Sequence, residues 1–159
     1  MNKNYDLALA LGNWIVDQLD STAYAIKEFR TSAGGDIVNA LQHGYPLLTI
    51  CIGEQIIIDA KRSTTSIFDY RFDVYYIWQD IAEKMNVEKF ICGAIDIIRA
   101  AILNDPGVFQ RTPYSAPPYS FQNVNPVHIN TIGPVLAYHD AKKDKDYNYR
   151  LMNISMFGK

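Results

Sequence analysis

The chain has 159 residues, of which 48% are apolar and 13% aromatic, and its formal net charge is −2. This length and apolar content suit one domain with its own core, so we expect a single domain over residues 1–159. The near-neutral charge gives no support for a basic face, and we expect no sequence-specific nucleic-acid binding. No apolar run has the length of a membrane span, and the first residues carry little positive charge, so we expect no membrane segment, no signal peptide and a cytoplasmic address.

The N-terminal part of the chain is expected to be helical. Apolar side chains recur there at three- and four-residue spacing and so share one helix face: Leu7, Leu11, Trp14, Ile15 and Leu19. Residues 23–29 either continue this helix or begin a second one. Further along, Asp36 is expected to cap a short helix over 37–41, which Gly44 would end.

A run of β-type composition follows. Residues 47–52 and 55–58 are rich in Ile and Leu and are separated by Gly53-Glu54, which predicts either a hairpin or a bulged pair of strands. Residues 68–78 alternate between aromatic and polar side chains, which predicts a strand with one buried aromatic face. The other face carries Asp69, Arg71 and Asp73, and we expect it to meet solvent or a neighbouring subunit. The alternatives are a surface ladder of compensating charges and a pair of carboxylates for acid–base chemistry.

The second half of the chain predicts one long helix and closing strands. Apolar residues at helical spacing run from Val87 to Ile102, with a helix end near Asn104. Residues 127–138 are strand-like but interrupted by Gly133-Pro134, and 147–157 form a last strand after a charged hairpin tip. The expected fold class is therefore α+β, a mostly antiparallel sheet with an N-terminal helix and a central helix packed on one face.

Residues 106–126 form a proline- and aromatic-rich segment, which we call the arm. Five of the seven prolines lie there, and proline removes backbone donors and blocks regular structure. A long aperiodic segment inside a domain is usually functional or disordered, and aromatic residues argue against plain disorder. We therefore expect an extended interface element with these aromatic contacts: Phe109, Tyr114, Tyr119 and Phe121.

Reactive constellations are sparse in this sequence. It has no phosphate-binding glycine loop and no nucleophile elbow. The histidines, His43, His128 and His139, lack the spacing of metal ligands, while Cys51 and Cys92 lie in apolar segments that favour burial. We therefore expect no catalytic residue, no metal and no cofactor.

The layout resembles the tail-terminator and head–tail neck (ring) proteins of tailed bacteriophages. The resemblance lies in element order and in four stretches: Pro46–Glu54, the strand Phe68–Trp78, the helix Val87–Ile102 and the strand Tyr149–Phe157. It implies a non-enzymatic virion protein that forms a homo-oligomeric ring between portal and tail, assembled in the host cytoplasm. Its partners would be copies of itself and portal, neck or tail-tube proteins, with DNA passing through the lumen.

Two other classes of function remain open from the sequence. One is a small ligand-binding domain or enzyme on an α+β scaffold, with a site near His128, His139 and Asp140. The other is a cellular adaptor or inhibitor that uses the arm at 106–126 as its binding element. A protein that turns over no substrate and assembles with itself would distinguish the ring from both.

Overall fold

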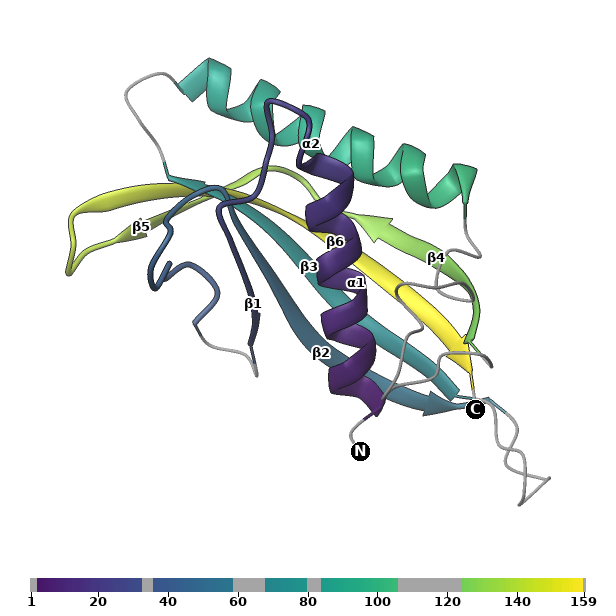
Figure 1. Cartoon of the computed structure of the whole chain (residues 1–159). Helices are drawn as coiled ribbons and strands as arrows, with labels where there is room; N and C mark the ends of the chain where they lie inside the picture. Colours follow the sequence, from purple (N-terminus) through teal and green to yellow (C-terminus); the bar gives the residue numbers. More distant parts are fainter. Residues whose placement is uncertain (1–2, 33–35, 59–67, 80–83, 106–123, 159) are drawn as a thin grey trace.

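Figure 1 shows the computed structural model, which describes residues 3–32, 36–58, 68–79, 84–105 and 124–158. In these ranges the chain forms two helices and six strands. In chain order they are α1 (Lys3–Leu19), β1 (Glu28–Ser32), β2 (Leu47–Ile57), β3 (Phe68–Gln79), α2 (Lys84–Asn104), β4 (Val124–Ile132), β5 (Leu136–Asp140) and β6 (Lys145–Gly158). The predicted α+β class is confirmed.

The described strands belong to one sheet in the order β1-β2-β3-β6-β4, with β5 also paired to β6. β1 runs parallel to β2, and the other pairs are antiparallel. β4 and β5 pair with different halves of β6, on the side away from β3. At their junction the Gly133 N–H donates to the Leu151 carbonyl over 2.8 Å. The interruption predicted at Gly133-Pro134 is therefore the point where one strand partner of β6 replaces the other.

Both helices lie on one face of the sheet, as predicted (Figure 1). α1 contacts β1 and β2, α2 contacts β3, β6 and β4, and the two helices touch each other. The main core fills the space between these layers, and the apolar stripes expected on both helices are buried in it, including Leu11, Ile15, Ile95 and Ile98. Each such side chain stabilises the fold by about 1.5–3 kcal/mol relative to an exposed one.

The prediction of a helix over residues 23–29 is wrong. The chain turns after Leu19 and enters β1 at Glu28, which pairs in parallel with Leu47 at the start of β2. Phe29 packs against the main core, and the Tyr24 carbonyl accepts a 3.0 Å hydrogen bond from the buried Tyr76 hydroxyl. These long-range contacts decide the conformation of a segment whose local composition fits either state.

The short helix predicted over 37–41 is also wrong, because side chains bind the carbonyls that a helix would use. In a helix the carbonyls of residues 36–39 would accept from the N–H groups four positions on. Instead Arg30 donates to the carbonyls of Asp36 and Asn39, and the Thr49 hydroxyl donates to that of Ile37 over 2.9 Å. The Tyr45 hydroxyl donates to the Val38 carbonyl.

Side chains also bind the N–H groups of that expected helical turn. The Glu28 carboxylate accepts from the N–H groups of Leu41 at 2.6 Å, Gln42 at 2.7 Å and His43 at 3.3 Å. The Tyr45 hydroxyl accepts from the Ala40 N–H at 3.4 Å. Tertiary contacts thus replace helical hydrogen bonding throughout residues 36–45, which we call the 36–45 segment, and Gly44 turns its end with a φ of 86° that favours glycine.

The run from 47 to 57 is a single strand with an irregularity. The register between β2 and β3 shifts between Ile52 and Gln55. At the shift, a Cβ on Gly53 would lie 2.9 Å from the Arg71 carbonyl oxygen, so glycine permits this close approach. The bulge interpretation is confirmed, and the hairpin alternative is wrong.

The strand predicted over 68–78 is confirmed as β3, and the helix predicted over 87–102 lies within α2. The closing hairpin is confirmed as β5 and β6, although its tip is shorter than the predicted 139–146. The arm falls outside the described residues up to position 123, and its last three residues, 124–126, belong to β4.

Candidate interaction surface

The face of the sheet opposite the helices is the candidate site, and we call it the helix-distal face. Residues paired directly across neighbouring strands lie on the same face, so the register defines its rows. On β3 the face carries Asp69, Arg71, Asp73, Tyr75 and Ile77, and their partners on β6 are Phe157, Ser155, Asn153, Leu151 and Tyr149. In the described ranges both helices lie on the other side, so this face is covered only where the 36–45 segment packs on it.

The predicted interface residues of β3 lie together on this face, but one expectation fails. Asp69 is 5% exposed, so its carboxylate does not face solvent. The register places it between Ile56 on β2 and Phe157 on β6, which flank it with apolar side chains. Arg71 Nε donates to Asp69 Oδ2 over 2.9 Å, so the charge is compensated along the same strand rather than across strands.

Asp73 belongs instead to a hydrogen-bonded polar band that crosses three strands. Asn153 Nδ2 donates to Asp73 Oδ1 over 2.7 Å. Asn130 Nδ2 on β4 donates to Asn153 Oδ1 over 2.8 Å and to Ser155 Oγ over 2.6 Å. Only Ser155 is fully buried among these four side chains, so the band presents amide and carboxylate groups that are fixed in place before any partner arrives.

Tyrosine side chains gather at the other end of the helix-distal face, in a group that the sequence analysis did not identify. Ring centroids lie 5.3 Å apart for Tyr45 and Tyr147, 6.4 Å for Tyr138 and Tyr147, and 5.9 Å for Tyr75 and Tyr149. We call these five residues the tyrosine cluster. The high tyrosine content, eleven in 159 residues, was one sign of such a surface. A second sign was the spacing of Tyr147 and Tyr149, which places both side chains on the same face of a strand.

Two hydroxyls of this cluster, those of Tyr45 and Tyr75, have a raised pKa and remain protonated at neutral pH. Burial raises the pKa of Tyr45 to about 12, and the neighbouring Tyr147 acts in the same direction. The hydrogen bond from the Ala40 N–H opposes this rise. Burial and then the carboxylate of Asp73 raise the pKa of Tyr75. The exposed part of the cluster, with Tyr138 at 47% exposure, offers aromatic area of the kind that is enriched in protein interfaces.

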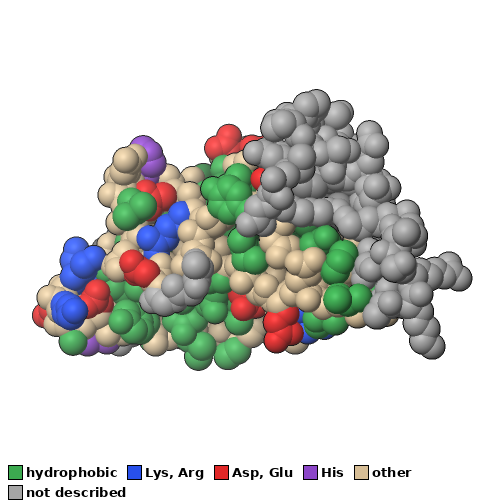
Figure 2. All heavy atoms as spheres, turned by 90° about the horizontal axis from the view of Figure 1, so that it is seen from below, with side chains coloured by type: hydrophobic (Ala, Val, Ile, Leu, Met, Phe, Trp, Pro, Cys, Tyr) green, Lys and Arg blue, Asp and Glu red, His purple; other side chains and the backbone are tan. Residues whose placement is uncertain are grey.

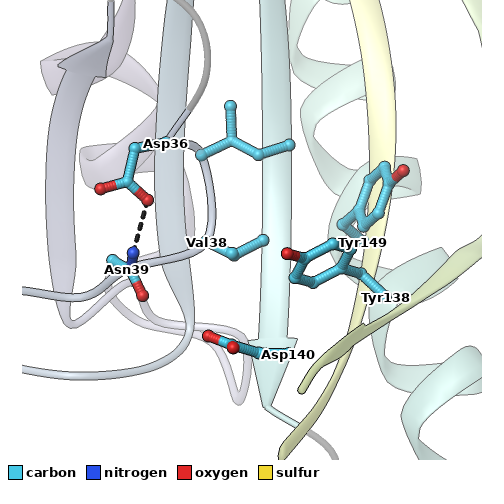
Figure 3. A pocket seen from close by; sticks show the side chains of 7 residues that line it. Asp36, Val38, Asn39, Tyr138, Asp140 and Tyr149 are labelled. Carbon is cyan, nitrogen blue, oxygen red and sulfur yellow. Dashed lines mark hydrogen bonds between the residues drawn. The ribbon is translucent and has the colours of Figure 1, made fainter. Parts of the chain in front are cut away.

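A cavity of about 240 Å³ opens between the 36–45 segment and β5 (Figure 3). Asp36 and Asn39 line one side and are joined by a 2.6 Å hydrogen bond. Tyr138 of β5 lies across from them, and Asp140 of β5 lies between the two sides, below Val38 in this view. The cavity is also lined by Ile37, Val38 and Tyr149, so apolar and carboxylate groups meet in one hollow.

Charged side chains of both signs gather at the end of the molecule that holds the β5–β6 hairpin (Figure 2). There His139 Nδ1 lies 2.6 Å from Asp146 Oδ1, and its Nε2 lies 3.6 Å from Asp144 Oδ1. Lys143 Nζ donates to Asn39 Oδ1 over 2.8 Å and so links the hairpin to the 36–45 segment. The hairpin tip is thus tied to Asn39, one of the residues that line the cavity.

The other predicted polar and sulfur residues lie apart. His128 stacks edge-on against Phe157 with centroids 5.2 Å apart, and the His43 N–H is bound by Glu28. Cys51 and Cys92 form no disulfide and are half-buried, which corrects the expectation of burial. Among the described residues, no three His, Cys, Asp or Glu side chains converge as metal ligands would. The interface residues predicted in the arm, Phe109, Tyr114, Tyr119 and Phe121, lie outside the described part of the chain.

Comparisons with known proteins add a limited finding. No protein-family model matches the chain, and no curated protein matches it. A chain of the virion of a native gene transfer agent particle is similar in structure, with a TM-score of 0.38 and 13% identity over 95% of this chain and 96% of that one. At that TM-score the similarity carries no argument about function. Neither of the described helices is long and apolar enough to span a bilayer.

Proposed function

We propose that this protein is a virion structural protein that forms a homo-oligomeric ring in the neck or at the head-proximal end of a phage tail. It acts by subunit contacts rather than by catalysis, as a tail terminator or head–tail joining protein. The ring assembles in the host cytoplasm and remains in the virion. Its neighbours are portal, neck or tail-tube proteins.

The helix-distal face is the observation that carries this proposal. It joins a prearranged polar band to a cluster of five tyrosines, and large aromatic area with fixed polar groups is what a subunit interface uses. Exposed apolar side chains continue it onto β5, where Leu136 is 45% exposed and pairs with Tyr149. A head-to-tail contact between such a face and a different surface of the next subunit generates a closed ring when the rotation between subunits closes on itself.

The order of elements supports the same proposal. An N-terminal helix, central strands, a central helix and closing strands follow one another as in the ring proteins that the sequence resembles. We infer that the four arm aromatics, Phe109, Tyr114, Tyr119 and Phe121, supply further contacts to the adjacent subunit. We also infer that DNA passes through the lumen, because a net charge of −2 disfavours tight binding to its phosphates.

Mass photometry and negative-stain microscopy of the purified protein, alone and with its co-expressed virion neighbours, test this proposal. We expect closed rings of one size. Leu136→Asp should abolish them by placing a charge in the interface, whereas Leu103→Asp, at a 64% exposed position on α2, should leave them intact. Serine at the four arm aromatics should weaken assembly as well.

Two results would contradict the proposal. One is a strict monomer that binds no virion component, and the other is reproducible turnover of a small molecule that one polar substitution removes. If Leu103→Asp disrupts the rings and Leu136→Asp does not, the interface lies on the helix layer and the assignment of the helix-distal face is wrong.

A further inference from the structure

The geometry points to the cavity between the 36–45 segment and β5 as a receptor for one arginine side chain of a partner protein. This inference rests on the proposed assembly role and names the chemistry that the partner must bring. Its elements are a small hollow, two tyrosine rings and two carboxylates, one from the 36–45 segment and one from β5 (Figure 3).

The size of the cavity favours a single side chain. A volume of about 240 Å³ lies below the range of about 300–1,000 Å³ that is usual for cofactor and drug-sized ligands. Ile37 and Val38 supply apolar contacts to the cavity, and Tyr138 and Tyr149 supply aromatic contacts. A long side chain with an aliphatic stem fits such walls and leaves its polar end at the rim.

The charges at the rim favour a cation. Asp36 is partly neutralised, since Arg30 Nη2 lies 3.9 Å from its Oδ1. Asp140 Oδ1 accepts from the N–H groups of Lys142 at 3.0 Å and Lys143 at 3.4 Å, and none of the described ion pairs involves its carboxylate. The ammonium of Lys143 bonds Asn39 and not Asp140, whose cross-strand neighbour on β6 is Lys145.

The tyrosine rings favour a guanidinium over an ammonium. Tyr138 is 47% exposed, and Tyr149 stands beside it in the same hollow. A planar guanidinium stacks on such faces and presents a fork of donors to carboxylates, while an ammonium is a compact and more strongly hydrated charge. Arginine is also enriched in protein interfaces, where lysine is depleted.

An NMR titration of the folded protein with N-acetyl-arginine amide tests this inference. The lysine analogue carries an ammonium in place of the guanidinium, and the norleucine analogue has an aliphatic chain without charge. We expect shifts at residues 36–39 and 138–140, and binding of the arginine probe about fivefold tighter than of the norleucine probe. Asp140→Asn, which keeps the Oδ1 acceptor of the turn, and Tyr138→Leu should each weaken binding roughly threefold.

Matched variants outside the cavity control for general effects. Asp96→Asn on α2 and Tyr5→Leu on α1 change the same side-chain types at exposed positions and should leave binding unchanged. Equal binding of arginine and norleucine, equal binding of arginine and lysine, or no binding at all would each overturn the inference. If rings still form in those cases, the assembly proposal stands; if the wild-type chain binds arginine but remains monomeric with its neighbours, that proposal fails instead.

Discussion

The Glu28 carboxylate binds the backbone of the 36–45 segment through three N–H groups. Partial burial alone would raise the pKa of Glu28, but hydrogen bonds from the N–H groups of Leu41, Gln42 and His43, with Arg30 nearby, bring it below its ordinary value. A lowered folded-state pKa means that the charged form stabilises the fold. That contribution is present above the unfolded-state pKa and is lost as the pH falls through the folded-state pKa.

Urea unfolding of the wild type and Glu28→Gln between neutral pH and about pH 3 measures this contribution. At neutral pH we expect the variant to be less stable by on the order of 1 kcal/mol, a value kept small because the carboxylate is screened by solvent. The difference should shrink in acid. Glu88→Gln on α2 is the matched control, and a difference that persists unchanged at low pH would contradict the account.

Asp69 shows where reasoning from single residues ends. Alternation along residues 68–78 placed it correctly on the polar face of β3, but not its burial. Its neighbours on the adjacent strands, Ile56 and Phe157, lie 13 and 88 positions away in sequence. No local pattern contains that information.

The packing of α1 on the sheet depends on a glycine in the middle of the helix. A Cβ at Gly12 would lie 1.9 Å from Cζ of Phe29, so the β1 ring occupies the space that an alanine methyl needs. Gly12→Ala gains about 1 kcal/mol of helix propensity but forces the ring out of a packed core, which costs about 1–3 kcal/mol or more. We expect a net loss, seen as a melting temperature lower by a few degrees.

A double-mutant cycle identifies the cause of that loss. Phe29→Leu alone should destabilise the fold by removing buried ring area, and in its presence Gly12→Ala should become neutral or stabilising. Thermal unfolding followed by circular dichroism gives the four values. Additive effects of the two substitutions would show that the ring and the glycine are not coupled.

Elements with a strong period were predictable from the sequence, and elements fixed by distant partners were not. The residue patterns of α1, β3, α2 and the β5–β6 hairpin each fit only one type of secondary structure. β1 is five residues long and is held by its parallel pairing with β2, and residues 36–39 are held by Arg30, Thr49 and Tyr45. The cavity was equally hidden, because it joins positions 36–39 to 138–149 across the fold.

At the scale of the whole molecule, the two faces of the sheet have different roles. The helix-facing side is a continuous apolar core, whereas the helix-distal side carries a second, small core under the 36–45 segment. Four of the five residues of the tyrosine cluster belong to that small core or pack against it, while Tyr138 and the polar band are partly accessible in the isolated chain. If subunits meet there, assembly changes the accessibility of one layer and leaves the other as it was.

Hydroxyl-radical footprinting of the isolated and assembled protein tests this asymmetry. Tyr138 and Leu136 on β5 should lose most of their reactivity on assembly, because the neighbouring subunit excludes solvent from them. Tyr5 on α1, which is 43% exposed, and Leu103 on α2 should keep theirs, and they match the first pair in side-chain type. Protection of the helix pair with full reactivity of the β5 pair would place the contact on the opposite layer, whatever the size of the oligomer.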